Sequence, residues 1–116
     1  MAPWSHLHVT PVGDVHPCCL INSDTSLLGN VNDKPLREIW NSKQLRDIRV
    51  SMLENKKHKS CEWCYTKERD FGSSFRYDFN SKYGDDLSLV ESTANDGTVE
   101  KMEMRYIDIR FSNLCN

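Results

Sequence analysis

Four cysteines fall into two tight pairs, and they are the side chains in this chain best suited to chemistry. Cys18 and Cys19 are adjacent, and Cys61 and Cys64 form a C-x-x-C motif. That spacing lets two thiolates point at one ion or cluster, while backbone N–H groups turn toward the sulfurs. Adjacent residues of a strand point to opposite faces, so one of Cys18 and Cys19 faces the second pair readily and the other needs a bend. Together the pairs predict a cysteine-ligated metal site.

More than one kind of site fits these thiols. Thiolates suit iron–sulfur clusters and zinc alike, so a structural zinc module that mediates interactions stands beside an iron–sulfur module. A thiol–disulfide oxidoreductase using Cys61 and Cys64 is a third reading. The polar, Lys-rich loop before the motif disfavours it, because a thioredoxin-like site expects a strand there. His6 and His8 share one face of an expected strand, where either could complete a tetrahedral site or both could be half-exposed.

Composition limits the class of protein. The 116 residues fit one domain, and with 38% apolar and 28% charged residues its core would be thin, so a metal would help to hold it together. The net charge of −2 argues against nucleic acid or an anionic membrane as partner. Five cysteines are an odd number, unlike the even framework of a small secreted domain. No stretch approaches the roughly 20 apolar residues of a spanning helix, and no signal peptide is seen. We therefore expect a cytoplasmic protein without membrane partners.

A β-hairpin is expected to carry the first cysteine pair. Residues 4–10 alternate and are rich in β-formers, residues 11–14 form a turn signal, and a second strand begins at Val15. Gly13 supplies the positive φ that the turn needs. The hairpin then delivers Cys18 and Cys19 at its far end.

Short helices should follow the hairpin. Asp33 is expected to cap a helix that has Pro35 in its first turn and ends near Trp40. Ser42 should cap a second helix that ends around Asn55, with an apolar stripe of Leu45, Ile48, Met52 and Leu53. Trp4, Trp40 and Trp63 are expected to lie in the core or to shield the metal site.

The remaining residues predict one more helix and one strand. Phe75, Phe79 and Tyr83 recur every fourth residue, which predicts an amphipathic helix ended by Gly84. Residues 85–103 read as a linker with a turn at 95–97, and residues 104–111 read as a strand. The expected fold is α+β: a small N-terminal β-hairpin and short helices around a cysteine-ligated metal site, followed by a linker and one C-terminal strand.

The order of several short motifs resembles the SPASM/twitch domains of radical S-adenosylmethionine proteins. The resemblance covers about the first 80 residues and rests on Pro3-Trp4-Ser5-His6-Leu7, Gly13-Asp14-Val15, Pro17-Cys18-Cys19, Leu28-Gly29-Asn30, Ile39-Trp40-Asn41-Ser42, Arg49, Cys61-Glu62-Trp63-Cys64 and Glu68-Arg69. In that family the module binds an auxiliary iron–sulfur cluster, usually a four-iron, four-sulfur one. The resemblance thus implies a 4Fe-4S cluster held by Cys18, Cys61 and Cys64, with Cys19 as substitute or fourth ligand.

The last residues, 108–116, resemble the first barrel strand of a radical S-adenosylmethionine domain as it enters its C-x-x-x-C-x-x-C loop. Cys115 would then be the first ligand of a second, catalytic 4Fe-4S cluster, at which S-adenosylmethionine is cleaved. The resemblance implies an auxiliary-cluster domain over residues 1–84, a linker with a possible hairpin over 85–103, and an incomplete barrel over 104–116. Such a fragment is not catalytic alone.

The same resemblance implies partners and one open question. The partners would be the missing catalytic barrel of the same polypeptide and an electron donor protein. Relatives commonly carry a cysteine just upstream of the Pro-Trp pair, where this chain has Met1 and Ala2. Either the N-terminus is also truncated, or the auxiliary cluster has one fewer protein ligand and an iron position open to substrate. The identity of the substrate is not indicated by these residues.

Overall fold

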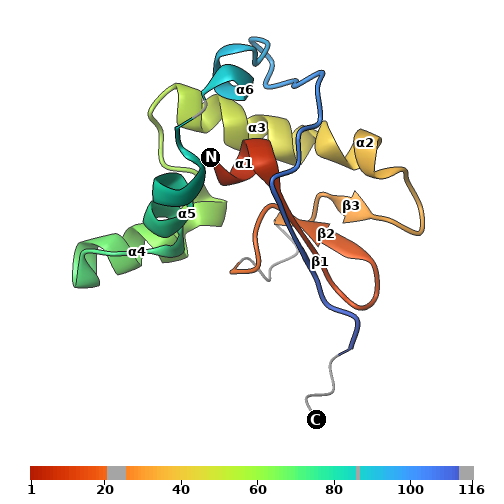
Figure 1. Cartoon of the computed structure of the whole chain (residues 1–116), viewed down its shortest axis with the longest axis horizontal. Coiled ribbons are helices and arrows are strands. Elements are labelled where there is room, and N and C mark those ends of the chain that lie inside the picture. The colour runs from red at the N-terminus through yellow and green to blue at the C-terminus, as the bar shows by residue number, and fades with distance from the viewer. Residues whose placement is uncertain (21–25, 86, 113–116) are drawn as a thin grey trace.

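The computed structural model describes residues 1–20, 26–85 and 87–112 (Figure 1). Helices and strands are mixed along the chain, which confirms the predicted α+β class. The elements follow in the order α1 (Ala2–Ser5), β1 (His6–Val9), β2 (Asp14–His16), β3 (Gly29–Asn30), α2 (Leu36–Trp40), α3 (Lys43–Leu53), the 3-10 helix η2 (Lys59–Cys61), α4 (Glu62–Phe71), α5 (Phe75–Tyr83), α6 (Ser88–Glu91) and β4 (Tyr106–Ile109).

The predicted hairpin is present and forms the middle of a four-stranded sheet. The strand order is β3-β2-β1-β4, with β1 and β2 antiparallel, β2 and β3 antiparallel, and β1 and β4 parallel. Gly13 has φ +91° in the turn, as predicted, and a Cβ there would lie 2.5 Å from the Asn32 amide nitrogen. The first strand is shorter than predicted, because Trp4 and Ser5 belong to α1.

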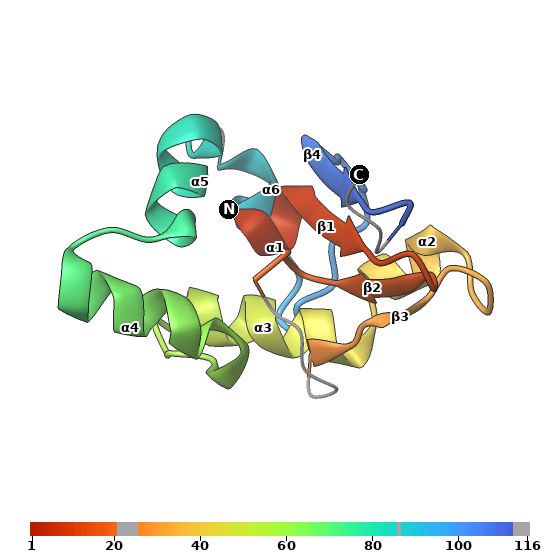
Figure 2. The same cartoon turned by 90° about the horizontal axis from the view of Figure 1, so that it is seen from below.

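One face of the sheet packs on α2 and α3 and makes the main core. Because side chains alternate along a strand, Leu7, Val9 and Val15 all point to this face. They cluster with five further buried residues: Leu28, Ile39, Trp40, Leu45 and Ile48. Figure 2 shows this sheet and α2 at one end of the molecule and α4 and α5 at the other.

The opposite face carries histidines, and it is buried as well. His6, His8 and His16 are 0%, 4% and 6% exposed, so the expectation that His6 and His8 are half-exposed is wrong. His8 lies opposite Asp108 of β4, and its Nδ1 is 3.0 Å from the Asp108 carboxylate. The His6 ring stacks on Phe79 of α5 with ring centroids 5.1 Å apart. Neighbouring elements therefore cover what an isolated hairpin would expose.

The predicted helices are present, with two local differences. Ser42 caps α3 by accepting a hydrogen bond from the backbone N–H of Leu45, as predicted. Asp33 does not cap α2; the helix follows Pro35 without a side-chain cap, and the Asp33 N–H donates to Asn30. Leu53 is 46% exposed, because it is the last residue of α3 and turns away from the core.

The segment after α5 folds back onto the N-terminus. It forms α6, and Leu89 and Val99 are buried against Trp4 in a second, smaller apolar cluster. The predicted turn at 95–97 is present, with Gly97 at φ +85° and its N–H donating to Ala94. Within the described ranges, no helix combines the length and apolarity needed to cross a membrane.

Candidate metal centre

Three cysteines from separate parts of the chain line one cavity. Cys18 follows β2, Cys61 ends η2, and Cys64 lies in the first turn of α4. About 70 Å³ of the cavity is open to the centre of a water molecule. The rest of the wall comes from the N-terminus and α1, from the residue after β2, and from α3 and α5: Met1, Ala2, Pro3, Pro17, Ile48, Met52, Phe75, Arg76 and Asn80. The structure therefore brings together one member of the first cysteine pair and both members of the second.

The C-x-x-C motif is shaped by the residues in front of it. The His58 ring accepts a hydrogen bond from the backbone N–H of Ser60, which caps η2. Cys61 then takes the N-cap position of α4, and Cys64 is buried one turn later. Trp63 lies between them at 50% exposure, so the expectation that it lies in the core or shields the metal site is wrong. The motif is thus the start of a helix, with both sulfurs on its cavity side.

Cys19 points away from this cavity. Its thiol lies within the electrostatic influence of Asp108 and Arg110, at the other side of the sheet, and it is absent from the cavity wall. The chain bends at Cys18 and turns at Cys19, directly after the end of β2, and this turn separates the directions of the two side chains. Of the two candidates in the first pair, Cys18 is the one that faces Cys61 and Cys64.

The thiols of the cavity are desolvated. Burial raises the pKa of Cys18 to about 12 and the pKa of Cys61 to about 11, and the neighbouring cysteines add to both increases. Burial also raises the pKa of Cys64, an effect opposed by a hydrogen bond from the backbone N–H of Arg76 to its sulfur. The backbone N–H of Leu20 makes a similar bond to Cys18. The wall therefore provides both an apolar environment and N–H donors directed at sulfur. These are two features that adjust the reduction potential of sulfur-ligated iron.

The histidines do not join the cysteines. His6 and His8 lie on the sheet and are absent from the cavity wall. Burial lowers the pKa of His6 to about 4, and in the described part of the chain neither of its ring nitrogens has a hydrogen-bond partner. Among the described residues, no group of three or more His, Cys, Asp or Glu side chains is arranged to hold a single metal ion. The three cysteines share a cavity without the close spacing that one ion requires.

The contribution of α5 was missed by the sequence analysis. The apolar repeat of α5 predicted the helix itself, but nothing in it indicates that Phe75, Arg76 and Asn80 close one side of the cysteine cavity. Glu68 of α4 holds α5 in this place, because both of its carboxylate oxygens accept hydrogen bonds from the Arg76 guanidinium. The predicted cluster ligand Cys115 lies outside the described residues.

Comparison with known proteins assigns the first part of the chain to a family. A family model described as an iron–sulfur cluster-binding domain, SPASM, matches residues 1–66 of the 116. The matched range contains Cys18, Cys61 and Cys64, and also Cys19. Neither the curated proteins nor the solved structures gave a match. Since the match covers more than half of the chain, this protein belongs to the SPASM family of iron–sulfur cluster-binding domains.

Proposed function

We propose that Cys18, Cys61 and Cys64 hold an auxiliary 4Fe-4S cluster in a radical S-adenosylmethionine enzyme. The observation that carries the proposal is the convergence of these three thiols, from the segment after β2, from η2 and from α4, on one cavity. Thiolates are the ligands that iron–sulfur clusters use, and the family is one that binds such clusters. A bound cluster would supply one-electron chemistry, and three protein thiolates would leave one of its four irons without a protein ligand.

The size of the cavity favours a cluster over zinc. About 70 Å³ is open to the centre of a water molecule, whereas a single water needs roughly 10–15 Å³ by the same measure. A structural zinc ion is instead enclosed by four ligands at about 2.0–2.3 Å. The three thiols surround a space that suits a group of several atoms, so the zinc module is the weaker proposal.

Thiol–disulfide exchange is also the weaker proposal. The attacking group in that chemistry is a thiolate, so catalytic cysteines have a lowered pKa and an electropositive, accessible setting. Burial instead raises the pKa of Cys61 to about 11 and raises that of Cys64. As free thiols both would stay protonated near neutral pH, and neither would be a good nucleophile.

The proposal extends to a parent enzyme. The residues of β4 resemble the first strand of a radical S-adenosylmethionine barrel, and β4 lies parallel to β1 at the edge of the sheet. An edge strand offers its free side to a further strand, and parallel neighbours are joined by helical crossovers of the kind that build barrels. We propose that a catalytic barrel with S-adenosylmethionine and its own 4Fe-4S cluster follows in the same polypeptide, and that an electron donor protein serves it.

Anaerobic reconstitution tests the cluster. The protein should become brown, with broad absorption near about 400 nm from thiolate-to-iron charge transfer, and should contain four irons and four sulfides per chain. Cys18→Ser, Cys61→Ser and Cys64→Ser should each lose most of the bound iron. Cys19→Ser is the matched control and should keep it, because Cys19 points away from the cavity. A folded, colourless, zinc-loaded protein would refute the proposal.

A further inference from the structure

The first turn of α5 directs a backbone N–H at a cysteine sulfur. Ser74 caps the helix by accepting from the N–H of Tyr77, and its own carbonyl accepts from Asp78. The N–H of Arg76 is one of the first-turn donors that a helix leaves without an internal acceptor. Arg76 and Cys64 line the same cavity, and this N–H is directed at the Cys64 sulfur across its wall. This bond joins the proposed cluster site to an element outside the residues matched by the family model.

A charged clamp holds this turn in place. The Arg76 guanidinium donates from Nε to Oε1 of Glu68 at 2.8 Å and from Nη2 to Oε2 at 2.5 Å. The Ser74 hydroxyl donates to Oε1 of the same carboxylate at 2.6 Å. Glu68 belongs to α4, the helix that begins with the C-x-x-C motif, so the clamp ties the donor helix to the ligand helix.

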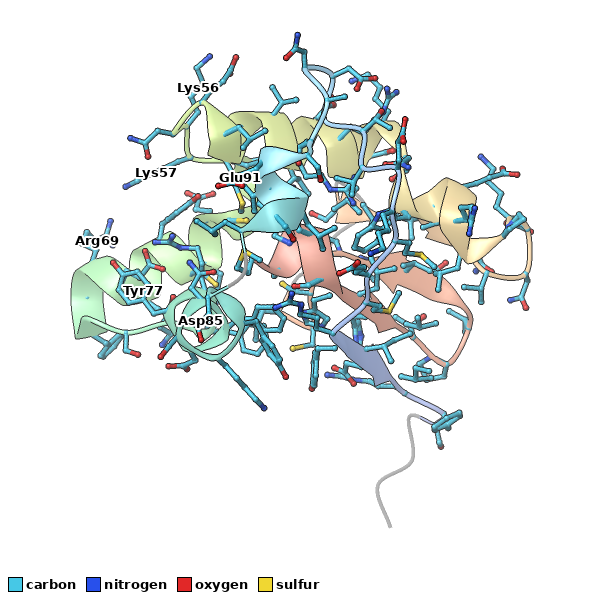
Figure 3. The ribbon with its side chains drawn as sticks, turned by 45° about the horizontal axis from the view of Figure 1, so that its top comes forward. Lys56, Lys57, Arg69, Tyr77, Asp85 and Glu91 are labelled. Atoms are coloured by element: carbon cyan, nitrogen blue, oxygen red, sulfur yellow. The ribbon has the colours of Figure 1, made fainter. Side chains whose placement is uncertain are left out.

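Aromatic rings restrict the guanidinium further. Its Cζ lies 5.2 Å from the ring centroid of Tyr65 and 5.0 Å from that of Tyr77, both within cation–π range. Figure 3 shows Tyr77 on the same side of the molecule as Arg69 of α4. The Glu68 side chain is only 11% exposed and that of Arg76 31%, so this pair is better shielded from solvent than the Arg46–Asp96 and Arg69–Asp70 pairs.

We propose that Arg76 is a positioning residue that sets the reduction potential of the cluster: its side chain clamps α5 to Glu68, and its backbone N–H donates to the Cys64 thiolate. The inference rests on the proposed function. A hydrogen bond to a ligating sulfur withdraws charge from it and stabilises the reduced, more negative cluster. The positive end of the α5 dipole and the positive charge of the guanidinium also stabilise the reduced cluster. Arg76 thus raises the potential relative to a site that lacks it.

Two substitutions at one position separate the backbone from the side chain. Arg76→Ala removes the guanidinium and keeps the N–H, whereas Arg76→Pro removes both, at a first-turn position where proline is tolerated. Lys82→Ala, which removes an exposed cation from the last turn of the same helix, is the charge-matched control. Spectroelectrochemical titration of the reconstituted protein measures the potential of each.

The expected order of potentials is wild type and Lys82→Ala, then Arg76→Ala, then Arg76→Pro as the most negative. Between the last two we expect about a tenfold fall in the equilibrium constant of one-electron reduction, which is about 59 mV. Equal potentials for Arg76→Ala and Arg76→Pro would overturn the inference while cluster binding still stood. A wild-type protein that takes up no cluster would overturn the proposed function, and the inference with it.

A measurement on the unaltered backbone covers the case in which Arg76→Pro fails to fold. Protein containing arginine labelled with 15N at the backbone nitrogen alone is reduced and studied by pulsed EPR, which detects the 15N nucleus of a backbone N–H bonded to a cluster ligand. The wild type should show this coupling, and Arg76→Lys, which keeps the N–H but carries no label there, should lose it. Absence of the coupling in the wild type, or its persistence in Arg76→Lys, would overturn the inference.

Discussion

Removing the Arg49 side chain should destabilise the fold strongly, although this residue lies outside the cluster site. It lies on α3, is fully buried, and reaches three separate parts of the chain. Its Nε donates to the Pro3 carbonyl at 2.9 Å, and its Nη1 donates to the Asn41 side chain at 3.0 Å and to the Gly97 carbonyl at 3.2 Å. Its Cζ lies 4.6 Å from the Trp40 ring centroid. The guanidinium therefore ties the N-terminus and the 95–97 turn to the main core.

The expected cost follows from the bonds and from what their loss leaves behind. Hydrogen bonds from a charged donor contribute about 1.5–3 kcal/mol each. Burial opposes this, since it lowers the pKa of Arg49 to about 10, and within the described residues no carboxylate pairs with it. Arg49→Met keeps the volume but leaves the Pro3 and Gly97 carbonyls without their donor. We expect a loss of roughly 3–5 kcal/mol in the free energy of unfolding. Arg49→Lys should lose about half as much. The ammonium keeps the positive charge and can still donate hydrogen bonds, but it cannot reproduce the planar fork of the guanidinium.

Urea denaturation of the cluster-free protein, followed by circular dichroism, measures these losses. Arg46→Ala is the matched control, because Arg46 belongs to the same helix and pairs with Asp96 at the surface. It should cost less than about 1 kcal/mol. If Arg49→Met is as stable as the wild type, the desolvation of the cation equals the value of its bonds, and the reasoning is wrong.

Three further predictions concern the turn at 95–97 and the buried sheet face. Gly97→Ala should lower the unfolding free energy by about 1 kcal/mol more than Gly72→Ala. Both glycines have positive φ, but a Cβ at Gly97 would lie 2.4 Å from the Arg46 carbonyl oxygen, whereas a Cβ at Gly72 would meet nothing within 4 Å. Equal losses in urea denaturation would contradict this prediction. Asn41→Ala should cost roughly 2–4 kcal/mol by urea titration, since its amide bonds both backbone groups of Val99; a loss below 1 kcal/mol would contradict it. His6 has its pKa lowered from 6.5 to about 4, so the unfolded state binds more protons and stability falls as pH drops through that window, by roughly 3 kcal/mol. His6→Phe should flatten this slope between pH 6.5 and 4, and an unchanged slope would exclude His6 as its source.

Local chemistry made several elements predictable. The Gly13 turn and the Ser42 cap each depend on a few neighbouring residues, and both are present in the structure. The pairing of Cys61 with Cys64 is local in the same sense, since the spacing alone places both sulfurs on one side of a turn. The choice of Cys18 over Cys19 was left open, because it depends on where the chain bends after β2 rather than on residue type.

Long-range packing explains the expectations that were wrong or missing. His6 and His8 are buried because α5 and β4, which follow at least 65 residues later, cover their face of the sheet. Trp63 is exposed because helical geometry gives Cys61 and Cys64 the cavity side of α4. The role of Arg76 depends on how two helices pack, and no periodicity within either helix encodes that contact.

The cavity and the main core share a wall, and this changes the part that a metal plays in the fold. The sequence suggested a thin core in need of a metal. In the structure, Ile48 of α3 is a core residue that also lines the cysteine cavity, and Met52, another residue of the cavity wall, packs against the same core. The apolar cluster around Trp40 forms without any cysteine side chain of the cavity. The protein part of the cavity can therefore exist before a cluster is bound. Binding then adds to stability through mass action, as for any ligand of a folded site, and the geometry of the three sulfurs is set by the core that stands behind them.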